Sequence, residues 1–178
     1  MKPLERPTRR ALLVAHVATS VSWLGLTLGL LTLGITASTT GDPDTTHAAY
    51  RAMKILVDRL IIPIALAALL TGVILSLGTP WGLARHRWIW IKFWLTLATL
   101  GATTLALRPT INAAVNAGVP DPSLIAAPCV ASSAYLFMTA LSVLKPWGLT
   151  RRGRRLRNLR NLASSHKAVD GRSPAPTR

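Results

Sequence analysis

Two basic residues stand inside apolar stretches, where an ionisable side chain is costly. His16 lies in the run from Ala11 to Ile35, which has no other ionisable side chain, and Lys92 lies near the start of a later apolar run. Ionisable residues within membrane spans commonly mark functional sites. A neutral imidazole can bind haem iron, and a His–Lys pair can handle protons. His16 and Lys92 are therefore the candidate cofactor-binding residues, with His16 a metal ligand only in the sense of a haem ligand.

Each of these residues also has a structural interpretation. Lys92 can extend its ammonium to the lipid headgroups, and His16 can donate a hydrogen bond to a neighbouring helix. His86, just before the third apolar run, could supply a second axial ligand, although a histidine between two arginines at an interface is more often solvated. The residue pattern leaves these alternatives open.

Four apolar stretches must position these side chains. They cover about residues 11–37, 55–77, 89–107 and 124–144. Each is close to the ~20 residues that an α-helix needs to cross a bilayer, and none shows the polar outer face of a soluble bundle. We predict an all-α, membrane-embedded four-helix bundle over residues 1–150, followed by a basic and largely disordered tail over 151–178.

Positive charge predicts the orientation of the bundle. Lysine and arginine are concentrated in the amino-terminal segment, in the loop before the third span and in the tail, which lie on one side of a four-span protein. Because lysine and arginine mark the cytoplasmic side, we predict that both termini are cytoplasmic. An aromatic belt is expected on the same side, formed by Trp81, Trp88, Trp90, Trp94 and Trp147.

Composition limits the partners and the setting. The net charge of +15 is concentrated on one membrane face, so the basic tail is expected to bind anionic lipids, at about 1 kcal/mol per basic side chain, and nucleic acid is not an expected partner. One cysteine, Cys129, allows no disulfide and no cysteine-based metal site within a chain. The arginine- and alanine-rich composition suggests a bacterial inner-membrane protein.

Several features predict helix contacts. Gly25-x-x-x-Gly29 favours close packing of helices, within the chain or in a homo-oligomer. Pro63 predicts a kink, and Lys54 and Asp58 are spaced to pair along one helix. Polar side chains at helical spacing predict a packing face on each span, and the members are: His16, Ser20, Trp23 and Thr27; Arg59, Pro63 and Thr71, a poorer set; Lys92, Thr96, Thr99 and Thr103; and Cys129, Ser132, Tyr135, Thr139 and Ser142.

The segment from His16 to Gly25, with Trp23-Leu24-Gly25, and the later Trp90-Ile91-Lys92 resemble a group of small bacterial membrane proteins. The group includes copper-resistance D proteins, HemJ-type protoporphyrinogen oxidases and a family of predicted integral membrane proteins, to which the likeness is greatest. It covers about residues 11–144. The resemblance to the HemJ-type enzymes implies haem binding, with His16 and Lys92 at the positions of essential residues.

Three functions follow as expectations. The first is a structural or accessory membrane component without enzymatic activity, in which His16 and Lys92 only pack and pair. The second is a haem-binding redox protein that uses His16. The third is transport of a small solute or a metal, although the spans lack the paired carboxylates of most proton-coupled carriers. One cysteine and three methionines also make Cu(I) an unexpected cargo.

Overall fold

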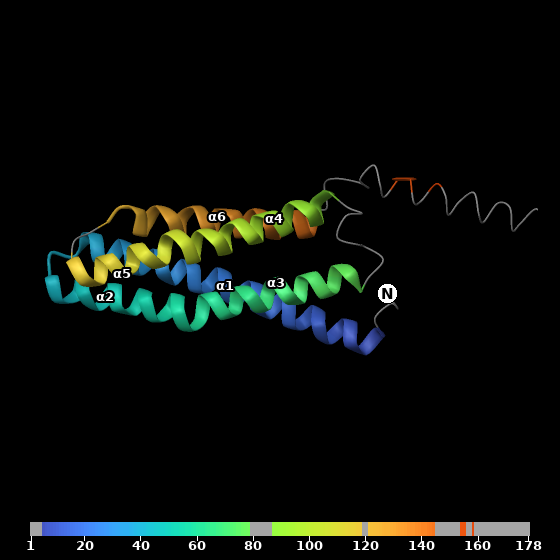
Figure 1. Cartoon of the computed structure of the whole chain (residues 1–178), viewed down its shortest axis with the longest axis horizontal. Coiled ribbons are helices and arrows are strands. Elements are labelled where there is room, and N and C mark those ends of the chain that lie inside the picture. Colours follow the sequence, from blue (N-terminus) through green and yellow to red (C-terminus); the bar gives the residue numbers. More distant parts are fainter. Residues whose placement is uncertain (1–4, 79–86, 119–120, 145–153, 156–157, 159–178) are drawn as a thin grey trace, which may run out of the picture.

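A computed structural model describes residues 5–78, 87–118, 121–144, 154–155 and 158. Four long helices run along one axis (Figure 1). Two of them contain a short π-helical segment, so the elements are α1 (Arg6–Thr39), α2 (Pro43–Leu56), η1 (Val57–Ile61), α3 (Ile62–Leu77), α4 (Arg87–Ala102), η2 (Thr103–Leu107), α5 (Arg108–Ala117) and α6 (Ser123–Leu144).

Each of the four helices is long and apolar enough to cross a membrane, which confirms the predicted all-α bundle of four spans. The third helix is longer than predicted, because it continues beyond residue 107 to Ala117. Most of the predicted tail lies outside the described residues. Arg154, Arg155 and Asn158 are described there, and they are helical and exposed.

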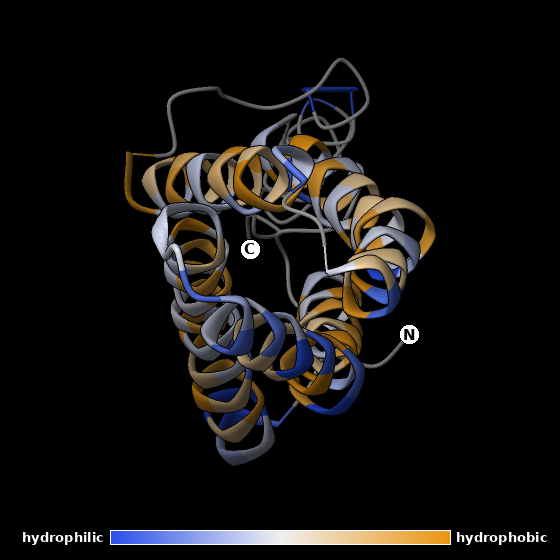
Figure 2. Ribbon diagram, turned by 90° about the vertical axis from the view of Figure 1, so that its left-hand side faces the viewer, coloured by the Kyte–Doolittle hydropathy of each residue, from blue (hydrophilic) through white to orange (hydrophobic). Residues whose placement is uncertain are grey.

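The two ends of the bundle are named by what they carry. The terminal end carries Arg6 and Leu144, and the loop end carries the connections from α1 to α2 and from α5 to α6 (Figure 1). Figure 2, viewed from the loop end, shows apolar residues on outward-facing as well as inward-facing sides of the helices. Large apolar side chains such as Leu105 (81% exposed) and Val143 (74% exposed) therefore project where lipid would cover them.

Both π-helical segments have the same cause. Pro63 and Pro109 follow η1 and η2 closely, at the starts of α3 and α5. Proline has no N–H and clashes with the carbonyl of the preceding turn, so the helix widens just before it. The amides of Ile62 and Arg108 accordingly bond to the carbonyls five residues earlier. The chain bends where α2 passes into α3 (Figure 1), as the Pro63 kink predicted.

The most deeply buried side chains lie in the loop-end half of the bundle. They come from α1, α2, η1, α3, α5 and α6, and α1 packs mainly against α3, α2 and α6. α2 and α5 have apolar inward faces and polar outward faces, which lets them continue the bundle beyond the apolar spans. The largest fully buried side chains are Leu30, Tyr50, Met53, Val57, Ile61, Ile111, Leu124 and Pro128.

Glycines make the closest helix approaches, but at positions other than the predicted pair. A Cβ at Gly25 or Gly29 would meet nothing within 4 Å, so the expectation of close packing within the chain at Gly25-x-x-x-Gly29 is wrong. A Cβ at Gly34 would lie 2.6 Å from the backbone oxygen of Leu124, so this glycine lets α1 and α6 touch. Gly118 ends α5 in the left-handed region, with φ of 66°.

Candidate functional site

His16 joins α1 to α3. Its Nδ1 lies 3.0 Å from the backbone oxygen of Ala68 and 3.1 Å from Oγ1 of Thr71. A carbonyl oxygen only accepts, so Nδ1 must carry the proton that is shared between these two acceptors. The Thr71 hydroxyl itself donates to the backbone oxygen of Ala67 at 2.7 Å. The imidazole is thereby held in one orientation, with Nε2 as the nitrogen that bears a lone pair when the ring is neutral.

Gly72 provides the room for this ring. A Cβ at Gly72 would lie 3.0 Å from Cε1 of His16, closer than ordinary van der Waals contact. The half-buried imidazole therefore packs directly over the backbone of α3. The sequence shows no spacing rule that links residues 16 and 72, so this seat could not be predicted from the pattern.

Lys92 joins α4 to α6. Its Nζ lies 2.6 Å from Oγ of Ser142 and 6.0 Å from the centre of the Trp88 ring. The Ser142 hydroxyl donates to the backbone oxygen of Met138 at 2.9 Å, so its oxygen is free to accept from the ammonium. The half-buried lysine thus has a hydrogen-bond partner inside the bundle, together with an aromatic face on its own helix.

The structure places His16 and Lys92 in the terminal half of the bundle, His16 on α1 and Lys92 on α4. Each donates a hydrogen bond to a different neighbouring helix, His16 to α3 and Lys92 to α6. His47 lies at the other end, where its ring faces Gly118, so it does not join this site. His86 lies outside the described residues. Within the described part of the chain, no three His, Cys, Asp or Glu side chains gather to hold a metal ion.

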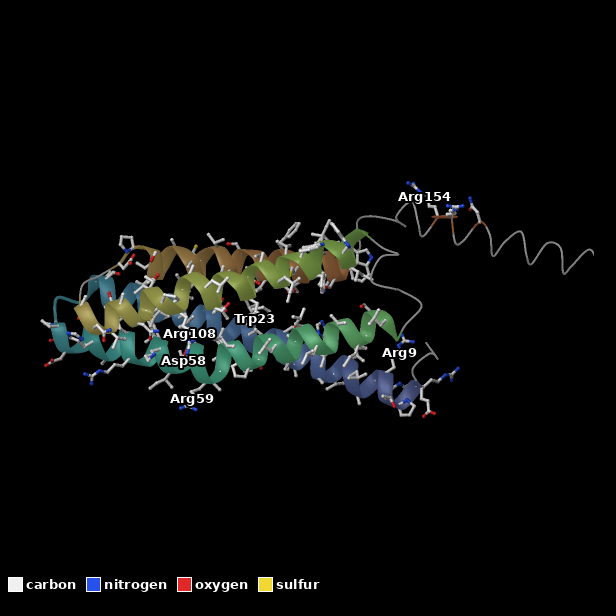
Figure 3. All side chains as sticks on the ribbon, in the orientation of Figure 1. Arg9, Trp23, Asp58, Arg59, Arg108 and Arg154 are labelled. Atoms are coloured by element: carbon white, nitrogen blue, oxygen red, sulfur yellow. The ribbon has the colours of Figure 1, made fainter. Side chains whose placement is uncertain are left out.

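An aromatic pair occupies the middle of the bundle, and sequence analysis did not predict this pairing. The rings of Trp23 and Tyr135 lie 4.5 Å apart between centres at 44°, and Trp23 lies between the helices in Figure 3. The side chains of Tyr135, Thr99 and Thr27 lie close together, where α6 meets α4 and α1. Among the described residues, the buried Nε1 of Trp23 and Oγ of Ser132 have no hydrogen-bond partner.

A charged cluster lies at the loop-end side of the spans. Asp58 accepts from Arg108 at 2.7 Å and from Lys54 at 3.3 Å, which confirms the predicted Lys54–Asp58 pair and adds a partner from another helix. Lys54 also donates to Asn112. Asp58 and Arg108 point toward each other in Figure 3, whereas Arg59 points away from the bundle. We call Lys54, Asp58, Arg108 and Asn112 the loop-end cluster.

The loop-end cluster marks one boundary of the membrane layer. Arg108 follows Trp88 by twenty residues and Gly78 follows Asp58 by twenty residues, and at 1.5 Å per residue each interval is about 30 Å. That length equals the thickness of the hydrocarbon core. His16 and Lys92 therefore lie toward the boundary marked by Trp88, and Asp58, at the opposite boundary, is too far away to orient His16.

The apolar helices and the depth of the charged residues together define a multi-pass helical membrane protein in contact with the lipid bilayer. Comparisons with family models, with curated proteins and with solved structures give no match for this chain. The assignment of a more specific function therefore depends on the geometry of the site itself.

Proposed function

We propose that this protein is a non-enzymatic accessory component of the membrane, in which His16 and Lys92 fasten helices together. The support for this proposal is that both side chains donate hydrogen bonds to other helices: His16 Nδ1 to the backbone of Ala68 on α3, and Lys92 Nζ to Ser142 on α6. In lipid, a polar group needs a partner inside the protein, and such bonds hold helices in register. The hydrogen bond of His16 joins α1 to α3, and that of Lys92 joins α4 to α6.

Double-mutant cycles combined with absorption spectroscopy test the accessory role. His16→Ala should lower the free energy of unfolding by about 0.6–1.7 kcal/mol, the range for hydrogen bonds between membrane helices. Thr71→Val should cost little more once His16 is gone, because the two side chains share one bond. His47→Ala is the matched control for loss of a histidine. The accessory role also requires that protein purified in mild detergent from haem-supplemented cells shows no Soret band.

A second candidate function, haem binding, is favoured by the orientation of the imidazole. Histidines that ligate metals typically donate their other ring N–H to a carbonyl or carboxylate, and His16 donates Nδ1–H to the backbone of Ala68. His16 Nε2 would then hold the iron, and the Lys92 ammonium would pair with a porphyrin carboxylate. The resemblance to HemJ-type proteins points in the same direction. A bound haem would supply one-electron redox chemistry.

The same spectra decide between the two candidates. A Soret band that persists in His47→Ala and disappears in a folded His16→Ala protein would overturn the accessory role and establish haem ligation. A colourless native protein that loses stability on His16→Ala would support the fastening role. A band that is retained in His16→Ala would contradict ligation by His16.

We further propose that the terminal end faces the cytoplasm of a bacterial cell. The support is the excess of lysine and arginine in the segments at that end and the tryptophans that flank α4. Alkaline phosphatase fused after Leu144 should be inactive, because this enzyme folds only outside the cytoplasm, whereas a fusion in the connection from α1 to α2 should be active. The opposite result would reverse the proposed orientation.

A further inference from the structure

A groove runs along the bundle between α4–η2 and α6. Its volume is about 550 Å³, and it is open along one side. The floor includes Leu30 of α1 and Ile61 of η1, which are both buried. Its two walls are made largely of alanines, and we call it the alanine groove: Ala98, Ala102 and Ala106 on one side, and Ala127, Ala131 and Ala134 on the other.

The alanine groove has the depth of one lipid leaflet. Its wall on α4–η2 extends from Leu95 to Leu107, which is twelve residues or about 18 Å. Leu107 adjoins Arg108 at the loop-end boundary of the membrane. The groove therefore begins at that boundary and reaches slightly past the middle of the ~30 Å hydrocarbon core.

The length of the groove selects among apolar occupants. Its wall on α4–η2 covers about 18 Å, whereas a second membrane-spanning helix needs about 30 Å and would extend well beyond it. A single alkyl chain that enters from the loop-end leaflet ends within the hydrocarbon layer, and its carbon atoms can pack at about 3.5–4.0 Å from the alanine side chains.

The polar groups that line the groove do not require a polar ligand. Thr27 donates to the backbone of Trp23 at 2.9 Å, and Thr103 donates to Thr99 at 2.8 Å, so these hydroxyl protons are used within their own helices. Tyr135 lines the groove from α6, and its ring stacks on Trp23. Thr99 likewise donates to the backbone of Leu95, and Ser123 lies at the loop-end start of α6, so the surface between them is largely alkyl.

We propose that the alanine groove holds one alkyl chain of a membrane lipid, drawn from the leaflet at the loop end. This site is separate from His16 and Lys92 and does not depend on the function proposed for them. A chain in the groove fills space between α4 and α6 that the alanine side chains leave open, and so makes van der Waals contact with both helices.

Electron spin resonance tests this proposal. Full-length protein is reconstituted in phosphatidylcholine vesicles that contain phosphatidylcholine with a nitroxide at mid-chain, and the lipids that are motionally restricted are counted. Ala134→Leu and Ala102→Leu fill the groove from opposite walls and should each remove one restricted lipid per protein. Ala140→Leu is the control, because Ala140 is exposed on the same helix as Ala134 and does not line the groove.

Two results would overturn the proposal that the groove holds an alkyl chain. An unchanged number of restricted lipids in both groove variants, with native circular dichroism, would overturn the proposal. Efficient crosslinking between two copies through Ala102→Cys, in a Cys129→Ser background, would show a second copy in the groove and would also overturn it. If Ala134→Leu fails to fold, Ala102→Leu still decides, because Ala102 is exposed on the other wall.

Discussion

The contact between Gly34 and Leu124 gives the sharpest prediction about stability. Alanine at position 34 would place its Cβ 2.6 Å from the backbone oxygen of Leu124, whereas ordinary contact begins at 3.4 Å. Neither partner is a flexible side chain, so α1 and α6 must separate by several tenths of an ångström. This separation would occur among fully buried side chains, including Leu30 and Leu124.

The magnitude follows from comparison with two other glycines of the same helix. Overpacking of a well-packed interior costs about 1–3 kcal/mol, and replacing glycine by alanine within a helix contributes about 0.5–1 kcal/mol in favour of folding. At Gly25 and Gly29 a Cβ meets nothing within 4 Å, so only the favourable contribution applies there. Subtracting the result for Gly25→Ala from that for Gly34→Ala therefore isolates the steric cost, about 1–3 kcal/mol.

Unfolding of the three variants in mixed micelles, followed by circular dichroism while the denaturing detergent is increased, measures these differences. Gly34→Ala should unfold first, and Gly25→Ala and Gly29→Ala should unfold with or after the native protein. Equal stability of all three variants would refute the close approach of α1 and α6. Instability confined to Gly25→Ala or Gly29→Ala would instead indicate that the outward face of α1 packs against another copy.

Three further predictions concern other contacts. Gly72→Ala should be less favourable in the native protein than in His16→Ala, with a coupling of about 0.5–3 kcal/mol in the double-mutant cycle, because the atoms nearest to the added Cβ belong to the imidazole. The hydroxyl and the amide of Thr45 donate to the Asp42 carboxylate and lower its pKa. The carboxylate therefore contributes fully to stability above about pH 4, and this contribution is lost as the pH falls through the lowered pKa. The thermal unfolding temperature of Asp42→Ala should accordingly fall less in acid than that of the native protein. Asp58→Asn should cost less than about 1 kcal/mol, and added salt should reduce the difference from the native protein, because its ion pairs are partly exposed.

The helices could be predicted from the sequence because their cause is local. An apolar run of about 20 residues has few alternatives to a membrane-spanning helix, since lipid offers no partner to an open backbone. The extension of the third helix beyond residue 107 was not predicted because α5 is amphipathic, with polar residues such as Asn112 and Asn116 on a segment that leaves the hydrocarbon layer. Hydropathy detects the part of a helix that lies in lipid, and not the part that continues into water.

Contacts between helices could not be predicted, because they depend on how each helix is rotated. The spacing of Lys54 and Asp58 indicated their pair, but Arg108 joins Asp58 only after two separate helices are brought side by side. The π-helical segment before Pro109 also shifts the register of every residue that follows it. Pro63 predicted only a kink where the first such segment lies, and the same reasoning applied to Pro109 would have predicted a kink at the second.

Side-chain burial differs between the two halves of the bundle, so substitutions in them should have different effects. The fully buried side chains lie in the loop-end half, and the half-buried His16 and Lys92 lie in the terminal half, where the helices diverge (Figure 1). Local stability in proteins varies in this way, and functional or mobile segments come from its lower end. Changes around Gly34 should therefore alter stability without altering any bound chromophore. If His16 is a haem ligand, its substitution should remove the absorption of a bound chromophore even in protein that stays folded. If His16 only links α1 to α3, its substitution should lower stability without such a loss.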